Sequence, residues 1–304
     1  MRMSQKPTRP QPERVGMSFK ERFLEDLDFL PPLPSLPPII ARLMKLINDY
    51  DSSVLDVAWV LREDPGLTVR VLRMANSPVY GARMPITSVP QAVLRLGMVQ
   101  IRNIILTLGI IRTLEGWGGP DRQAFWQHSV AVAFTTESIL QLAVPSAEEA
   151  RDESAFAAGL LHDVGLLILR EYYPAVVLEI KRVASEQGLP THEAEMAALE
   201  TDHGRIGALI AARWGLPQAI VSGIDFHHQP ALASPEDRRV ADLVHLAECI
   251  CCRQGIGDAG DGVPTEPNPE TLQNLGVDPG LFPEIVKHTQ ASAKKSALLI
   301  ELAR

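Results

Sequence analysis

Apolar residues recur at helical spacing along almost the whole chain, and no segment alternates between apolar and polar residues as a half-buried strand does. Between residues 39 and 47, for example, Ile40, Leu43, Met44 and Ile47 follow the pattern of one buried helix face. Aromatic residues make up only 5% of the 304 residues, which is low for a β-sandwich or a barrel. The apolar content of 46% is sufficient to bury a sizeable core. We therefore predict an all-α protein.

Glycine and proline divide the predicted helices into groups. The clearest break is GWGGP at residues 116–120, because three glycines and a proline within five residues do not continue a helix. We predict a flexible N-terminal tail (1–29), an N-terminal helical subdomain (30–118), a second helical domain (119–254), and a loop with a C-terminal helix (255–304). Within the second domain, the pattern predicts uninterrupted helices over residues 154–172 and 191–214.

Charge and cysteine content exclude several classes of protein. Lysine and arginine number 29 against 37 acidic residues, a net charge of −8, so the average field repels nucleic acids and anionic membranes. The three cysteines, Cys249, Cys251 and Cys252, have no second cluster to pair with and suit a reducing compartment. The N-terminus has no signal-peptide pattern, and the most apolar segment, residues 96–114, contains two arginines. We expect a cytoplasmic protein that binds neither nucleic acid nor membrane.

Histidine and aspartate are concentrated in the second domain, at or near the ends of predicted helices. Neutral imidazole and carboxylate are ligands for Fe, Mn, Zn or Ni, and the absence of thiolates in the set disfavours a structural zinc site. A single histidine in an apolar context is more often a hydrogen-bonded core residue than a metal ligand, so no one of these positions alone indicates a metal site. The candidates are His128, the pair His162–Asp163, His203, the pair His227–His228, and Asp242.

Seven longer motifs place these residues in a wider pattern. Three lie in the first region: LPSLP (33–37), EDPGLTVRVLRMANSPVYG (63–81) and SVPQAVLRLG (88–97). Four lie in the second: FWQHS (125–129), AFAAGLLHDVG (155–165), ETDHGRIGALIAARWGLP (200–217) and FHHQP (226–230). In this order the chain resembles the bacterial HDOD proteins, a branch of the HD superfamily of metal-dependent phosphohydrolases, over about residues 30–250.

The resemblance implies an HD-like helical metal-site domain preceded by an N-terminal helical subdomain. Many HDOD proteins are thought to have lost metal ligands and to act as signalling modules, whereas this chain has a candidate at each ligand position of the related HD-GYP phosphodiesterases. Two features depart from the HD-GYP pattern: Leu166 stands where a lysine follows HDxG, and the GYP-bearing loop is absent. A lysine there would stabilise charge on a phosphate. The implied metal ligands are His128, His162, Asp163, His203, His227, His228 and Asp242.

Three functions remain open on these residues. The first is a signalling or regulatory protein that acts through a protein partner or a small phosphate-containing ligand. The second is a metal-dependent phosphohydrolase or phosphodiesterase for a nucleotide or cyclic dinucleotide, with Asp163 as a metal ligand and catalytic proton acceptor. The third is an iron-based redox or oxygen sensor. The resemblance implies one or two divalent ions, with Fe or Mn favoured over Zn or Ni. The hydrolase and the sensor depend on the metal, whereas a signalling protein could act without it. None of the three functions defines an oligomeric state.

Overall fold

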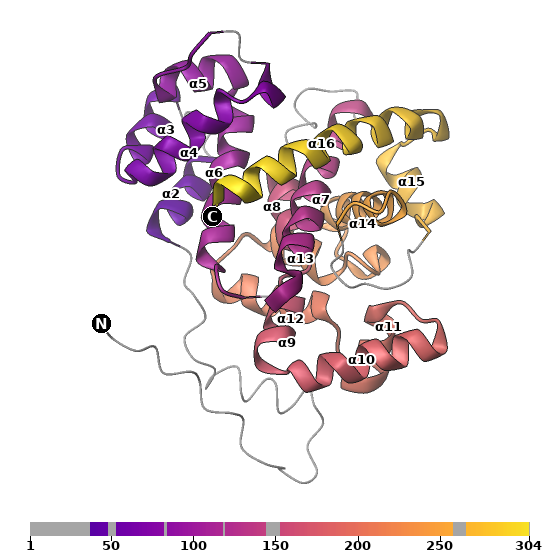
Figure 1. Cartoon of the computed structure of the whole chain (residues 1–304). Helices are drawn as coiled ribbons and strands as arrows, with labels where there is room; N and C mark the ends of the chain where they lie inside the picture. The colour runs from indigo at the N-terminus through magenta and orange to yellow at the C-terminus, as the bar shows by residue number, and fades with distance from the viewer. Residues whose placement is uncertain are drawn as a thin grey trace, which may run out of the picture.

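The computed structural model describes residues 37–47, 53–81, 84–117, 119–143, 153–257 and 266–303. Every regular element in these ranges is a helix, which confirms the all-α prediction (Figure 1). The predicted tail (1–29) and most of the LPSLP motif lie outside the described residues.

The first region consists of short helices with capping residues at their ends. Ser53 caps one helix in a capping box with Asp56, and Ser88 caps another by accepting a hydrogen bond from the backbone of Gln91. Gly97 ends that second helix at φ 86°, a conformation that favours glycine. The elements are α2 (Pro38–Ile47), α3 (Val54–Leu61), α4 (Pro65–Ala75), η1 (Pro78–Tyr80), α5 (Val89–Leu96) and α6 (Met98–Thr113).

The second region contains the longer helices and the C-terminal elements. Residues 255–280, expected to be largely a loop, include one short helix in their described part, and the last predicted helix is present. The elements are η2 (Gly119–Asp121), α7 (Arg122–Ala143), α8 (Glu153–Leu161), α9 (Val164–Tyr172), α10 (Pro174–Gln187), α11 (Thr191–Leu199), α12 (His203–Arg213), α13 (Gln218–Asp225), η4 (Pro230–Leu232), α14 (Arg238–Arg253), α15 (Pro269–Leu275), η5 (Pro279–Leu281) and α16 (Phe282–Ala303).

Two predictions of uninterrupted helices were wrong, and both breaks occur at candidate site residues. The helix expected over 154–172 divides into α8 and α9 at His162–Asp163, and the helix expected over 191–214 divides into α11 and α12. The second break follows from Glu200, which ends α11 in the left-handed conformation at φ 56°. Asp202 then caps α12 by accepting a hydrogen bond from the backbone of Arg205. Apolar periodicity continues through both breaks, so it does not reveal them.

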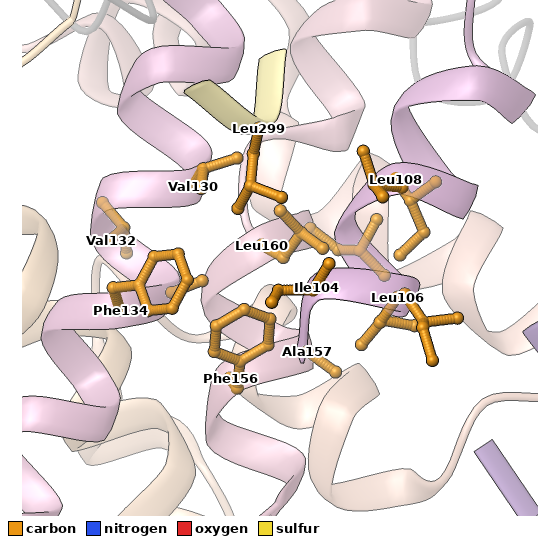
Figure 2. Close-up of a cluster of buried hydrophobic side chains, with 14 of the residues drawn as sticks. Ile104, Leu106, Leu108, Val130, Val132, Phe134, Phe156, Ala157, Leu160 and Leu299 are labelled. Atoms are coloured by element: carbon orange, nitrogen blue, oxygen red, sulfur yellow. The ribbon is translucent and has the colours of Figure 1, made fainter. Parts of the chain in front are cut away.

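A single hydrophobic core crosses the glycine-rich break at residues 116–120. Side chains of α6, α7, α8 and α16 meet in it, including Ile104, Val130, Phe156 and Leu299 (Figure 2). The rings of Phe134 and Phe156 pack edge to face at a centroid distance of 5.3 Å. Helix α16 lies against both α7 and α6 (Figure 1). The C-terminal helix therefore joins the two regions, and the predicted domain boundary separates segments that share one core.

No single helix in the described ranges is long and apolar enough to cross a membrane. The pair α5 and α6 reaches that length and apolar content only together, and it bends by 116°.

Candidate metal centre

Candidate side chains from four parts of the second region converge on one buried point. His128 projects from α7, His162 and Asp163 form the turn between α8 and α9, and His203 is the first residue of α12. His227 and His228 follow the end of α13. The side chains of His162, Asp163, His203 and His227 are 0% exposed and that of His128 is 1% exposed. These polar groups are therefore fully desolvated, which is costly unless something satisfies them.

Asp163 lies at the centre, with an imidazole on each side of its carboxylate. The Nε2 atom of His162 is 3.1 Å from one carboxylate oxygen, and Nε2 of His128 is 4.0 Å from the same atom. The other oxygen is 3.2 Å from Nε2 of His203 and 3.9 Å from Nε2 of His227. Asp163 stands at the N-cap position of α9 but its side chain does not cap that helix, so the carboxylate is available to the cluster.

Backbone and carboxylate acceptors orient each ring. Nδ1 of His162 donates to the carbonyl of Gly159 at 2.8 Å, and Nδ1 of His227 donates to that of Ile224 at 2.6 Å. Nδ1 of His128 faces the carbonyl of Ile256 at 3.2 Å. A carbonyl only accepts, so Nδ1 carries the proton in these rings and the Nε2 lone pair points inward. Second-shell bonds of this kind are typical of metal-ligating histidines.

His203 has a carboxylate as its second-shell partner. Glu195 of α11 accepts hydrogen bonds from the Nδ1 of His203 at 2.7 Å and from its backbone N–H at 2.8 Å. The Nε2 atoms of His203 and His228 are 2.8 Å apart. This is a hydrogen-bond distance, and the same two residues belong to one group that could hold an ion.

Three glycines allow α9, α12 and α13 to approach closely enough to assemble the cluster. A Cβ atom on Gly165 would lie 2.0 Å from the carbonyl oxygen of His203. A Cβ on Gly204 would lie 3.1 Å from the ring of His227, and one on Gly207 would lie 3.1 Å from Val164. The HDxG motif thus requires glycine because α9 packs directly on the backbone of His203, and the DHG motif requires it because α12 packs on the end of α13.

Without a metal ion, protons must neutralise this cluster. Burial raises the pKa of Asp163, but the neighbouring imidazoles of His162 and His203 outweigh it, so the pKa lies well below its usual value. Burial lowers the pKa of His203, but Glu195 and Asp163 outweigh it and hold the pKa well above its usual value. Burial and the nearby His162 lower the pKa of His227. Asp163 and His203 each stabilise the charged form of the other, which is why their pKa values move in opposite directions.

The residues fit a divalent metal ion. Both carboxylate oxygens of Asp163 and Nε2 of His227 are buried and have no hydrogen-bond partner in the described part of the protein. Two ligand groups are close enough to hold an ion, with the atoms of each group within 4.8 Å of one another. The two oxygens of Asp163 face one group each, so this residue could bridge two ions. The groups are His128, His162 and Asp163, and His203, His227 and His228.

Asp242 is the one predicted ligand that the structure does not bring to the cluster. Its carboxylate, on α14, accepts hydrogen bonds from Thr271 and from Asn274 at 3.0 Å, both on α15. Arg238, one turn earlier on α14, donates to the same carboxylate at 3.1 Å. The carboxylate of Asp242 therefore links α14 to α15, and Arg238 compensates its charge.

Three residues near the histidines were not predicted from the sequence. Glu195 supports His203, and Glu248 of α14 lies 4.0 Å from Nε2 of His227 and 3.8 Å from Nδ1 of His228. The ring of His192 stacks on that of His228 at a centroid distance of 3.9 Å. The available signal was an acidic residue within an apolar helical stretch, LVHLAECIC for Glu248. Buried acids are rare unless paired.

A helical fold with a buried histidine–aspartate centre at helix junctions defines an HD-type protein, and comparison with known proteins agrees. The model of the HDOD domain matches residues 33–230, and the chain belongs to this family.

Two solved structures are similar over nearly their whole length. An HDOD domain protein of unknown function from Geobacter sulfurreducens is 26% identical with a TM-score of 0.71, covering 92% of this chain and 94% of that one. A protein provisionally named a phosphohydrolase from Shewanella amazonensis SB2B is 26% identical with a TM-score of 0.69, covering 91% and 97%.

An uncharacterized protein of Treponema pallidum (strain Nichols) is 24% identical over 220 residues, which are 72% of this chain. The match spans 42% of the length of that relative.

Proposed function

We propose that this protein is a metal-containing regulatory member of the HDOD family. The observation that carries the proposal is the set of four Nε2 atoms within 4.0 Å of the Asp163 carboxylate, each from a buried ring. Burying these polar groups is costly unless a bound cation compensates for it, so their burial favours a retained metal ion. The donor set of imidazoles and one carboxylate favours Fe or Mn, and it could also hold Zn or Ni.

Burial of the ligands favours regulation over turnover. The residues around the carboxylate are 0–1% exposed, so an external phosphoester reaches the centre only if the surrounding packing opens. Leu166, one turn into α9, is 4% exposed and offers no charge to a phosphate. A bound metal would supply a Lewis acid and an activated water, while the chain itself orients the ligands and excludes solvent.

We further propose a protein as the signalling partner, contacted through the N-terminal helices. Leu55 and Trp59, one turn apart on α3, are 70% and 61% exposed, and Leu94 of α5 is 82% exposed. Exposed apolar residues of this size, grouped in one region, are typical of interaction surfaces. A small phosphate-containing ligand is the alternative partner.

The alternative function is a metal-dependent phosphohydrolase, and the bridging position of Asp163 favours it. In binuclear hydrolases, a shared carboxylate holds two ions that clamp the attacking and leaving oxygens. In this mechanism Asp163 would be both ligand and catalytic proton acceptor, although a residue engaged by four imidazoles has little freedom to accept a further proton.

One comparison separates the two functions. The full chain, loaded with Mn or Fe, is assayed for hydrolysis of bis(4-nitrophenyl) phosphate and of a cyclic dinucleotide beside Asp163→Asn. The regulatory proposal predicts that wild type binds metal and that its hydrolysis does not exceed that of the variant. Hydrolysis that depends on metal and is lost in Asp163→Asn would instead establish the phosphohydrolase. A wild-type protein that binds no metal would refute both.

A further inference from the structure

A cavity of about 320 Å³ lies between α6, α7 and α16, on residues that the metal centre does not use. Its walls come from the two regions of the chain, because α6 belongs to the first region and α16 crosses from the C-terminal end (Figure 1). Its volume falls at the lower end of the range for small-molecule sites, about 300–1,000 Å³. The residues that define its chemistry are Gln100, Phe134, Glu137, Lys287, His288 and Lys295.

The α16 side of the cavity is cationic. Lys287 and Lys295 lie two turns apart on the same helix, and both line the cavity. The ammonium of Lys295 rests over the rings of Tyr80 and Phe134, 5.4 Å from each centroid, so its stem is fixed. Within the described residues this ammonium makes no hydrogen bond, and its three N–H donors remain available to an acidic group.

The α7 side presents acceptors. Glu137 accepts hydrogen bonds from Nε2 of Gln100 at 2.8 Å and from Asn103 at 3.3 Å. Because the amide nitrogen of Gln100 is used in this way, its Oε1 atom points elsewhere, and that atom is buried with no partner in the described structure. A buried acceptor without a donor is destabilising, and a donor on a ligand would satisfy it.

We propose that the cavity binds a small zwitterion. Its amino group would donate to Gln100 and face the carboxylate of Glu137, and its carboxylate or phosphate would be held by Lys287 and Lys295. The positive charge of Lys295 already acts on the carboxylate of Glu137, so a ligand with a single charge would compensate one of the two groups and weaken the contact of the other. His128 and Glu137 stand nine residues apart on α7, about 14 Å along one rigid helix, so an occupied cavity and the metal centre share an element.

Isothermal titration calorimetry of the full chain tests this with defined probes. The zwitterions are 4-aminobutanoate and 2-aminoethyl phosphate, and the probes lacking one charge are butanoate, ethyl phosphate and butylamine. At least one zwitterion is expected to bind about tenfold more tightly than each of the three single-charge probes, since each charge-assisted contact contributes separately. The tighter of the two zwitterions identifies the acidic group as carboxylate or phosphate.

Variants on α16 supply the matched control. Lys295→Met keeps the apolar stem over the two rings, and Lys287→Gln changes an exposed residue, so both are expected to fold and to bind about tenfold more weakly. Lys294→Met, an exposed lysine beside the cavity residue and outside the lining, should bind as wild type does. Absence of binding by any zwitterion to folded wild type overturns the proposal. Equal binding of the single-charge probes, or an equal loss in Lys294→Met, also overturns it.

Discussion

Replacing Gly165 by alanine tests whether helix packing holds the histidine–aspartate centre together. The added Cβ atom would lie 2.0 Å from the carbonyl oxygen of His203, 2.8 Å from its carbonyl carbon, and 3.0 Å from the backbone nitrogen of Gly207. All three atoms belong to the backbone of α12, so no side-chain rotation relieves the overlap. Helix α9 must move away from α12, and the carboxylate of Asp163 must move away from His203.

The cost of this movement should be large. Overpacking a core typically costs about 1–3 kcal/mol, and an overlap with rigid backbone places this site at about 3 kcal/mol or more. For a chain of 304 residues, that corresponds to a fall in Tm of roughly 5 °C, measured by thermal unfolding in far-ultraviolet circular dichroism. Metal content, measured on the same samples, should fall because Asp163 no longer faces both ligand groups.

Gly66→Ala is the matched control. Its Cβ would meet only side-chain atoms, the nearest being the carboxylate of Asp64 at 3.2 Å, and the residue lies in the first turn of α4. Alanine in a helix is favoured over glycine by roughly 0.5–1 kcal/mol, so stability should be unchanged or slightly higher. A Gly165→Ala protein with wild-type Tm and metal content would refute the packing argument.

Three further predictions concern single side chains around the centre. Glu195→Gln removes the carboxylate that orients His203 and should weaken metal affinity about 10–100-fold in a chelator competition assay. Asp242→Asn should lower the free energy of unfolding by about 1–3 kcal/mol in urea denaturation, through its contacts with α15, and leave metal content unchanged. Burial lowers the pKa of His192 to about 4. Between about pH 6.5 and 4 the folded state therefore binds fewer protons than the unfolded chain. The free energy of unfolding of the metal-free protein then falls as the pH falls. In His192→Gln this fall should be smaller, and an unchanged slope in urea denaturation at stepped pH would contradict it.

Helical content, helix caps and the general location of the site could be predicted from the sequence because they depend on local patterns. Ser53, Ser88 and Gly97 act on neighbouring residues, and their roles follow from residue type and position. The breaks at residues 162–163 and 200–202 could not be predicted in the same way. Both breaks lie where α9 packs against α12, which is a contact between segments distant in the sequence.

The candidate ligands also differ in whether the sequence could predict their positions. Five histidines and Asp163 converge, as the motif order suggests. Asp242 instead accepts hydrogen bonds from α15, a helix that lies within the predicted loop. Glu195 and Glu248 were not predicted as part of the site because an acidic residue on a helix is usually solvated. Only the fold reveals that these two face buried rings.

The central claim, that the convergent histidines form a metal centre, is tested most directly by elemental analysis of the purified full chain after exposure to Fe or Mn. The account predicts at least one divalent ion per chain in wild type, retention in His288→Ala, whose histidine is exposed and distant from the cluster in sequence, and loss in His162→Ala. Wild-type protein that binds no metal, or a His162→Ala protein with the same metal content as wild type, would contradict it.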